Sequence, residues 1–216
     1  MRTLTDSLDA LGNQTFVLRS TLTSPFGRKV RMAAEVLKVS GRLMVVPADT
    51  LDANDTLRQH NPLGKLPCLL LADGTAIYGS GVIIEFLQDL AGSEQMLPRS
   101  GLARYTTLTR ATLADGIGEA ALLMVYEGRF RDAGTHSARW LDHQRGKIAR
   151  ALSVFAAAPP AADKTDLVSI GLCCALGYLD WRKPVEWRTS YPQLAAWLAA
   201  FAAHEPAFAR TAAPAA

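Results

Sequence analysis

The residues best suited to take part in a reaction are Ser24-Pro25-Phe26-Gly27. They follow an apolar, β-branched run and begin an amphipathic segment. Two cysteines in this frame, between a strand and a helix, would make a thiol–disulfide redox site. This sequence has neither sulfur. Because no protein sulfur could form a mixed disulfide at this position, thiol exchange is disfavoured. What remains is a serine hydroxyl at the start of a helix, with proline at the first helical position, where it is well suited.

A serine hydroxyl in this position can stabilise a thiolate. It can donate a hydrogen bond to the sulfur, while the positive end of the helix favours negative charge. Lowering a thiol pKa of about 8.5 by about two units takes roughly 2.7 kcal/mol. A hydrogen bond to a charged group (about 1.5–3 kcal/mol) and a helix terminus (about 0.3–2 kcal/mol) can together supply this. Two alternatives stay open: Ser24 only caps the helix, or Thr23 is the active hydroxyl.

Other catalytic signatures are absent from the sequence. There is no glycine-rich phosphate loop and no G-x-S-x-G nucleophile motif. The histidines have no spacing typical of metal ligands, so no metal is predicted. They are His60, His136, His143 and His204.

Composition restricts the partners. The 216 residues suffice for one large or two small domains, and 49% hydrophobic with 20% charged residues is ordinary for a soluble globular protein. A net charge of +3 is small for a nucleic-acid binder. The only dense basic cluster, Arg28, Lys29 and Arg31, is either a solvated helix face or an attractor of an anionic ligand.

The sequence also predicts a cytoplasmic location without a membrane partner. No run approaches the ~20 apolar residues of a membrane span, and the first residues lack the features of a secretory signal. The three cysteines cannot build a disulfide framework, which points to a reducing compartment. Cys173 and Cys174 are predicted to be buried in a helix.

The elements that would position Ser24 follow from the hydrophobic pattern. The first part of the chain predicts a βαβ unit, a polar connection, a hairpin that turns at Asp73-Gly74, and a final amphipathic helix. This order, βαβ-ββα, indicates an α/β domain with a mixed sheet. The predicted strands span 14–19, 43–46, 68–71 and 75–78, and the predicted helices span 25–41, 51–60 and 80–90.

Strand signals disappear beyond a turn-rich linker. The later helices are predicted over 102–129, 135–158, 167–181 and 191–204, which together indicate an all-α bundle. The predicted division is an N-terminal extension over 1–13, a first domain over 14–91, a linker over 92–101, a helical domain over 102–210 and a tail over 211–216.

Three motifs in this order and spacing, "SPFGRKVR", "NPLGKLP" and "YGSGVIIEFL", followed by an all-α half, resemble the cytosolic glutathione transferases. The similarity covers almost the whole chain after the extension. It is strongest to bacterial and plant-type members with Ser-Pro-Phe at the start of the first helix. The resemblance implies a thioredoxin-like N-terminal domain that binds glutathione as cosubstrate. It also implies an all-α C-terminal domain that lines a second-substrate pocket, and a homodimer.

The resemblance implies roles for individual residues as well. Ser24 matches the hydroxyl that contacts the glutathione sulfur. A cis bond before Pro67 would turn the Leu66 backbone outward to pair with the cysteinyl part of glutathione like an added strand. Lys65 matches a residue that reaches the glycine carboxylate, and Ser80, at a helix N-terminus, suits the γ-glutamyl end. Otherwise Pro67 would be an ordinary strand-start proline and Lys65 a solvent lysine.

Gly79 departs from the family pattern. The family has an acidic residue or glutamine before the serine, and here that side chain is missing. The loss of one charge-assisted contact, roughly 1.5–3 kcal/mol, would weaken glutathione binding about ten- to hundredfold. The alternative is that the true ligand is not plain glutathione.

The helical half offers less specific signals. Asp166 and Ser169 exchange the residue types of the family's helix-capping pair, so Asp166 can cap while Ser169 is the poorer reciprocal partner. A buried aromatic residue on a helix belongs to the core more often than to a pocket. The candidates for the second-substrate pocket are Phe26, Tyr105, Asp115, Glu119, Tyr126 and Trp181.

These observations predict a glutathione transferase-like enzyme of detoxification. Ser24 would stabilise the glutathione thiolate for attack on a small hydrophobic electrophile or for reduction of a peroxide. The alternative, favoured by Gly79, is a non-catalytic module of the same fold that carries a ligand or binds a regulatory partner.

Overall fold

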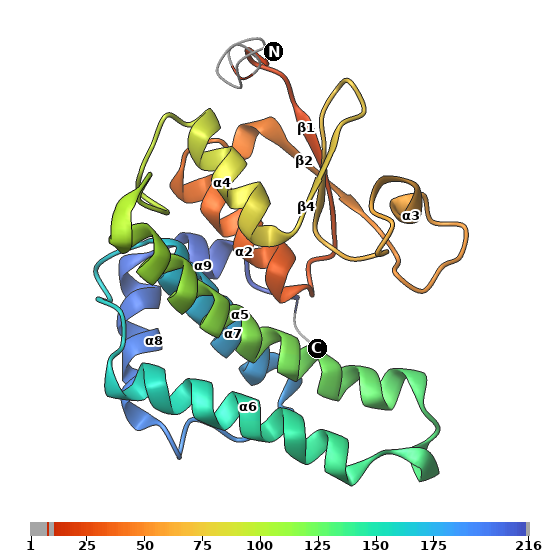
Figure 1. The fold of residues 1–216 in the computed structure, drawn as a ribbon, viewed down its shortest axis with the longest axis vertical. Coiled ribbons are helices and arrows are strands. Elements are labelled where there is room, and N and C mark those ends of the chain that lie inside the picture. Colours follow the sequence, from red (N-terminus) through yellow and green to blue (C-terminus); the bar gives the residue numbers. More distant parts are fainter. Residues whose placement is uncertain (1–7, 9–10, 215–216) are drawn as a thin grey trace. The chain divides into compact units, whose positions relative to one another are not determined.

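The computed structural model describes residue 8 and residues 11–214. The chain divides into two units, Met1–Met96 and Leu97–Ala216 (Figure 1). Most of the predicted extension over 1–13 lies outside the described residues, as do the last two residues of the predicted tail.

The first unit contains a four-stranded mixed sheet in the order β2-β1-β3-β4. β1 pairs in parallel with β2 and antiparallel with β3, which is antiparallel to β4. The predicted thioredoxin-like βαβ-ββα fold is therefore confirmed. The strands are β1 (Phe16–Ser20), β2 (Leu43–Pro47), β3 (Cys68–Leu70) and β4 (Ala76–Tyr78), and the helices are α2 (Pro25–Val36), α3 (Leu57–His60) and α4 (Ser80–Leu90).

Alternation along the strands places apolar side chains on both faces of this sheet. On one face, where Figure 1 shows α2 and α4, Phe16 of β1 is fully buried and meets Phe86 of α4 edge to face at 5.6 Å. A second small core joins Leu57 of α3 to Cys68 of β3, with Leu66 packed against it. The strands at the centre of the sheet are therefore held from both sides.

Two predicted helices are shorter in the structure. α2 ends at Val36 and not at Gly41, because Lys38 adopts a left-handed conformation (φ 59°) and the Val39 N–H closes the end on the Ala34 carbonyl. A 3₁₀ turn, Ser40–Arg42, follows.

Over 51–60 only Leu57–His60 is helical. Asp49, Asp52 and Asp55 each accept a hydrogen bond from the N–H two residues further on, at 2.7–2.8 Å. These local side-chain bonds favour turns over a helix.

The described part of the second unit is helical, with no strand, as predicted. α5 contacts both α6 and α7, and α7 is buried on almost every side, including Cys173 and Cys174. Such a helix forms the centre of a bundle. The helices are α5 (Gly101–Phe130), α6 (Ala138–Ala157), α7 (Leu167–Arg182), α8 (Pro192–His204) and α9 (Ala207–Arg210), with a 3₁₀ turn at Ala133–Thr135.

The exchanged capping pair at the start of α7 works in both directions. The Asp166 carboxylate accepts the N–H groups of Val168 and Ser169, and the Ser169 hydroxyl accepts the Asp166 N–H at 2.8 Å. Ser169 is therefore a full reciprocal partner, contrary to the prediction. Thr211, the first residue of the predicted tail, is buried, and its hydroxyl donates to the Ala207 carbonyl.

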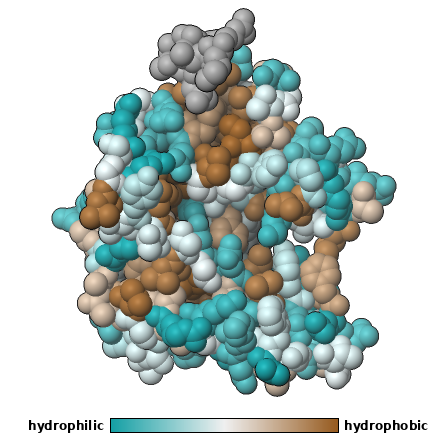
Figure 2. All heavy atoms as spheres, viewed as in Figure 1, coloured by the Kyte–Doolittle hydropathy of each residue, from teal (hydrophilic) through white to brown (hydrophobic). Residues whose placement is uncertain are grey.

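Hydrophobic side chains remain exposed in separate patches among polar ones on the face that Figure 2 shows. Large apolar side chains that are exposed include Met44, Tyr78, Val82, Leu102 and Tyr105. Within residues 11–214, none of the helices combines the length and hydrophobicity that a bilayer crossing needs.

Candidate functional site

The strand register brings three of the predicted motifs to one end of the sheet. Arg19 on β1 lies opposite Cys68, the first residue of β3, and Cys68 lies opposite Tyr78, the last residue of β4. Because β3 is antiparallel to both neighbours, the segments that follow β1, precede β3 and follow β4 emerge at the same edge. These segments carry Ser24, Leu66-Pro67 and Gly79-Ser80.

Ser24 is the N-cap residue of α2. Its backbone is extended (φ −75°, ψ 123°), and its hydroxyl oxygen accepts the Gly27 N–H at 3.1 Å. In the described part of the chain no acceptor engages its hydrogen, whereas the Thr23 hydroxyl pairs with that of Thr21 at 3.2 Å. Capping therefore leaves Ser24 with a proton to donate, which favours it over Thr23 as the active hydroxyl.

Gly27 allows this helix start to lie directly against the end of β1. A Cβ atom at this position would overlap the hydroxyl oxygen of Ser20 and come within 3.3 Å of the Ser20 Cβ. Ser20 is fully buried. Close packing against Ser20 therefore favours glycine at this position.

Leu66 leaves its backbone N–H and C=O unpaired in the described chain, while its side chain packs in a small core. The Leu66–Pro67 peptide bond is cis, as the resemblance implies, and the Leu66 side chain packs against the core of Leu57 and Cys68. Among residues 11–214 nothing is hydrogen-bonded to the Leu66 N–H or C=O. Both groups can therefore pair with an extended peptide, in the manner of β-strand addition.

Asn61 shapes the turn before Leu66, and no sequence pattern had predicted a role for it. It is buried, its amide nitrogen donates to the Lys65 carbonyl at 2.8 Å, and its oxygen accepts the Leu63 N–H at 3.1 Å. Gly64 supplies the left-handed residue of this turn (φ 59°). The Asn-Pro pair in "NPLGKLP" is a turn signal that could have identified it. The Lys65 side chain is exposed, and its ammonium has no partner in the described chain.

The start of α4 offers unpaired N–H groups. Gly79 is the N-cap residue, so no side chain caps the helix, and Ser80 is the buried first residue. The first-turn N–H groups and the helix dipole suit a carboxylate. Gly79 has φ 89° and ψ 117°, a conformation that other residues rarely adopt.

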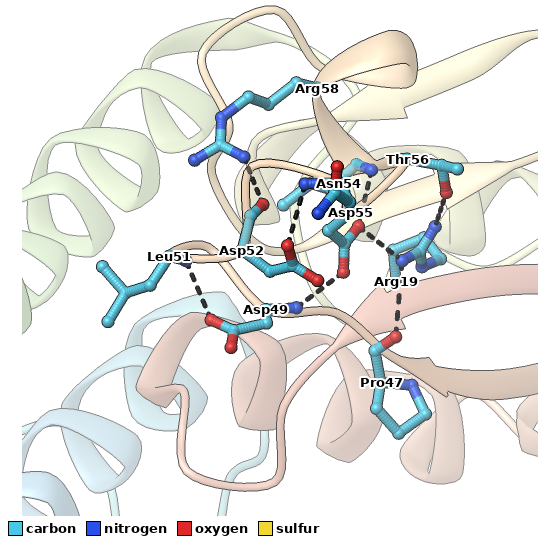
Figure 3. A network of polar contacts seen from close by, with 10 residues as sticks. Arg19, Pro47, Asp49, Leu51, Asp52, Asn54, Asp55, Thr56 and Arg58 are labelled. Atoms are coloured by element: carbon cyan, nitrogen blue, oxygen red, sulfur yellow. Dashed lines mark hydrogen bonds and ion pairs between the residues drawn. The ribbon is translucent and has the colours of Figure 1, made fainter.

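A buried ion pair behind these segments was not predicted (Figure 3). Arg19 and Asp55, with side chains 10% and 11% exposed, meet at 2.8 Å. The guanidinium also donates to the hydroxyl of Thr56 at 2.8 Å and to the carbonyl of Pro47 at 3.4 Å. Arg19 within the otherwise apolar run Phe16–Ser20 was the sequence feature that could have predicted a buried ion pair.

This network fixes the loop that leads to α3. The Asp55 carboxylate accepts the N–H groups of Asp49 and Leu57, each at 2.7 Å. These backbone N–H groups, together with the Arg19 charge, hold the pKa of Asp55 below its ordinary value of 3.8. Leu57 in turn packs in the core that anchors Leu66. The ion pair thus stabilises the position of Leu66 through Leu57 and the core that they share.

The residues predicted for the second-substrate pocket do not gather in one place. Tyr105 and Tyr126 both lie on α5, 21 positions apart in the printed sequence, which at ~1.5 Å per residue separates them by about 30 Å. Tyr105 and Glu119 are exposed, and Asp115 and Phe26 are half-buried. Tyr126 and Trp181 each contact other aromatic rings of the helical unit.

Metal ligands do not cluster in the described chain: no three histidine, cysteine or carboxylate side chains lie where they could hold an ion together. All three cysteines are buried, and none forms a disulfide.

Comparison with known proteins places these features in context. Residues 23–90 match the family model of the glutathione S-transferase N-terminal domain. The chain is 32% identical to the uncharacterized GST-like protein YibF of Escherichia coli (strain K12), over 82% of this chain and 89% of that protein.

Solved structures extend the similarity to the full fold. A glutathione transferase family member from Pseudomonas fluorescens Pf-5, with bound glutathione, is 39% identical with a TM-score of 0.86, over 93% of this chain and 100% of that one. A glutathione S-transferase from Methylobacillus flagellatus KT, with glutathione bound, is 31% identical with a TM-score of 0.82, over 92% and 99%.

Proposed function

Because the chain belongs to the glutathione S-transferase family, we propose that it binds glutathione at the sheet edge of its first unit and activates the glutathione thiol. The observation that carries this proposal is Ser24, whose hydroxyl caps α2 and keeps its own proton free. This hydroxyl lies at the sheet edge where the unpaired Leu66 backbone and the uncapped start of α4 also emerge.

Each part of glutathione has a matching group at this edge. The Leu66 N–H and C=O suit the cysteinyl backbone, and the first turn of α4 with Ser80 suits the γ-glutamyl carboxylate. The Lys65 ammonium, exposed and unpartnered in the described chain, suits the glycine carboxylate. Cosubstrate glutathione would then arrive with its sulfur toward the N-terminus of α2.

The chemistry we propose is nucleophilic attack by glutathione on a small hydrophobic electrophile. The thiol proton leaves to solvent, and the Ser24 hydroxyl and the α2 terminus stabilise the thiolate. The sulfur forms a bond to the electrophilic carbon while the leaving group departs with its electron pair. Reduction of a peroxide would use the same thiolate. Phe26, half-buried and two residues beyond Ser24, is the candidate of the first unit to face the second substrate.

The second candidate function is a non-catalytic ligand-binding or regulatory module. Gly79 favours it, because no side chain at this position can hold the γ-glutamyl end. Cytoplasmic detoxification and a homodimer belong to the main proposal. Exposed Tyr78 and Val82, on either side of this glycine, give apolar surface that a second copy would cover.

Calorimetry with glutathione and turnover of chlorodinitrobenzene test the two functions. We expect wild type to bind glutathione and to bring its thiol pKa about two units below 8.5. Ser24→Ala should return this pKa toward 8.5 and lower turnover at neutral pH about ten- to hundredfold, while costing about 1 kcal/mol of stability through the lost cap.

Thr23→Ala is the matched control and should leave the thiol pKa unchanged. Absence of binding at millimolar glutathione would remove the proposed function. Unchanged turnover in Ser24→Ala would show that Ser24 does not activate the thiol. A loss of turnover in Thr23→Ala alone would assign that role to Thr23.

A further inference from the structure

The start of α4 is rich in hydrogen-bond donors. The N–H groups of Ser80, Gly81 and Val82 have no carbonyl partner in the described chain, because a helix leaves its first N–H groups free. Ser80 is only 8% exposed, and its hydroxyl has no hydrogen-bond partner among the described residues. A hydroxyl buried to this degree usually has one. These four groups together suit a carboxylate, which accepts several hydrogen bonds at once.

Groups that could hold a positive charge are missing from the same place. The three segments at this sheet edge contain no aspartate or glutamate; they span 23–27, 61–67 and 78–84. The Gly79 carbonyl is already used, since it accepts the Ile83 N–H at 3.0 Å. Glu85, the next carboxylate along α4, lies more than one turn beyond Ser80, is half-buried and has an interaction of its own. An ammonium group bound here would have no carboxylate from these segments beside it.

The fixed charges of this edge are positive. α2 and α4 both begin here, and the N-terminus of each helix carries about half a positive charge. The exposed Lys65 ammonium adds a full charge. The nearby Arg19–Asp55 pair is neutral overall. The edge therefore stabilises an anion and destabilises a cation.

Glutathione carries charges of both signs at its γ-glutamyl end. The α-carboxylate and the α-ammonium are bonded to the same carbon atom, so a carboxylate bound at the start of α4 brings the ammonium to the same helix terminus. With a pKa of about 8, this amino group is mostly charged at neutral pH. Its charge therefore meets the positive end of α4 without a compensating carboxylate.

Gly79 and Gly81 leave open space around Ser80. Within the described chain, a Cβ atom on Gly79 would have only a Val82 methyl carbon within 4 Å, at 3.7 Å, and a Cβ atom on Gly81 would have no neighbour within 4 Å. Val82 is itself exposed, as is Tyr78 on the other side of Gly79. These surroundings suit a small uncharged acyl group better than an ammonium group.

We propose that this site selects glutathione-type thiols whose α-amino group is uncharged, such as an N-acyl glutathione, over plain glutathione. This inference rests on the proposed function, because it concerns the same cosubstrate site. The α-carboxylate binds the first-turn N–H groups of α4 and the Ser80 hydroxyl. The acyl group lies beside Gly79 and Gly81, and the thiol lies toward Ser24. Acylation removes the cation that the helix terminus repels and keeps every group that the site binds.

Calorimetry with two S-methylated ligands tests this selectivity apart from thiol activation. S-methylglutathione keeps the ammonium, N-acetyl-S-methylglutathione does not, and neither has a thiol that can ionise. Wild type should bind the N-acetyl ligand about two- to fivefold more tightly, because a charge at a helix terminus changes affinity by about this factor. Equal affinities, or tighter binding of S-methylglutathione, overturn the proposal.

A carboxylate added at the start of α4 should reverse the preference. Gly79→Glu should bind S-methylglutathione at least about tenfold more tightly than the N-acetyl ligand, because the new carboxylate accepts a charged hydrogen bond from the ammonium. Gly79→Ala is the matched control: it places a side chain at the same positive φ without the carboxylate and should keep the wild-type preference. Each comparison uses two ligands on one variant, so the effect of backbone strain cancels.

Gly81→Glu gives the same test without strain, since Gly81 does not have a positive φ and a Cβ atom there meets no described atom within 4 Å. Gly81→Gln is its uncharged control. Reversal in either glutamate variant supports the proposal. An unchanged preference in both overturns it, because the amino group would then not lie at the start of α4. Failure of wild type to bind glutathione and both S-methylated ligands at millimolar concentration overturns the proposed function instead.

Discussion

At the N-terminus of α2, a single serine hydroxyl serves the fold and is available for chemistry. Its oxygen accepts the Gly27 N–H at 3.1 Å, and its hydrogen has no acceptor in the described chain. Capping uses a lone pair and thiolate stabilisation uses the proton, so the two roles do not compete. The two interpretations of Ser24 that the sequence left open are therefore compatible.

The missing side chain at Gly79 leads to a prediction about the affinity for glutathione. Gly79→Glu restores a side chain of the family type, but at φ 89° and ψ 117° any side chain costs about 1–3 kcal/mol of backbone strain. Gly79→Ala has the same strain without the carboxylate and is the matched control. Calorimetry should show glutathione binding ten- to hundredfold tighter in Gly79→Glu than in Gly79→Ala. Equal affinities would show that the missing side chain does not limit binding.

Gly27 gives a prediction about packing. Alanine favours helices over glycine by about 1 kcal/mol, yet Gly27→Ala should lower the free energy of unfolding by about 1–3 kcal/mol, because its Cβ overlaps the Ser20 hydroxyl. Urea unfolding measures the change. The double variant Ser20→Ala/Gly27→Ala removes the overlapping oxygen and should regain much of the loss. A double variant no more stable than Gly27→Ala would contradict this explanation.

At the scale of elements, the Arg19–Asp55 pair connects β1 to the loop before α3, which Figure 3 shows in detail. The loop holds its shape through aspartates that accept nearby N–H groups, and Asp55 adds the link to the sheet. Leu57 follows directly and packs in the core beneath Leu66. The network therefore helps to hold the Leu66 backbone in place.

The pH dependence of stability tests this network. Because N–H groups of Asp49 and Leu57 and the Arg19 charge lower the pKa of Asp55 in the folded state, its contribution is fully present above pH 3.8 and is lost as pH falls through the folded pKa. The difference in urea midpoint between wild type and Asp55→Asn should therefore stay constant from neutral pH to 3.8 and narrow from there to about pH 3. A difference that does not narrow below pH 3.8 would show that the charge of Asp55 is not responsible.

At the scale of the molecule, the two units contribute different chemistry. The first unit holds the groups proposed for glutathione, and the second is a helical bundle centred on the buried helix α7. Exposed apolar side chains occur in both, at Tyr78 and Val82 in the first unit and at Leu102 and Tyr105 in the second. Contiguous exposed apolar surface marks interaction sites, so these side chains are the candidates for one.

We expect these side chains to contribute to the proposed homodimer. Light scattering at micromolar concentration should give a dimer for wild type and a monomer for Val82→Glu/Leu102→Glu, because burying two carboxylates without partners is costly. Val154→Glu, an exposed apolar residue of α6, is the matched control and should remain dimeric. A wild-type monomer would contradict the prediction directly.

Much of the fold could be predicted because it depends on local patterns. The hydrophobic stripe of α2, the Asp73-Gly74 hairpin and the loss of strand signals after the linker each carry their own physical signature. The end of α2 and the loop over 51–56 could not be placed, because a left-handed Lys38 and aspartate-centred turns override a weak helical preference.

The sequence by itself determined the order of elements, the helix start at Ser24 and the unusual glycine at position 79. Only the tertiary structure decided which groups lie together and which remain unpaired. Strand register brought Ser24, Leu66 and Ser80 to one edge, and the fold placed Asp55 against Arg19 of β1. The reason is physical: residue type and periodicity act over a few positions, whereas hydrogen-bond partners and burial depend on segments far apart in the chain.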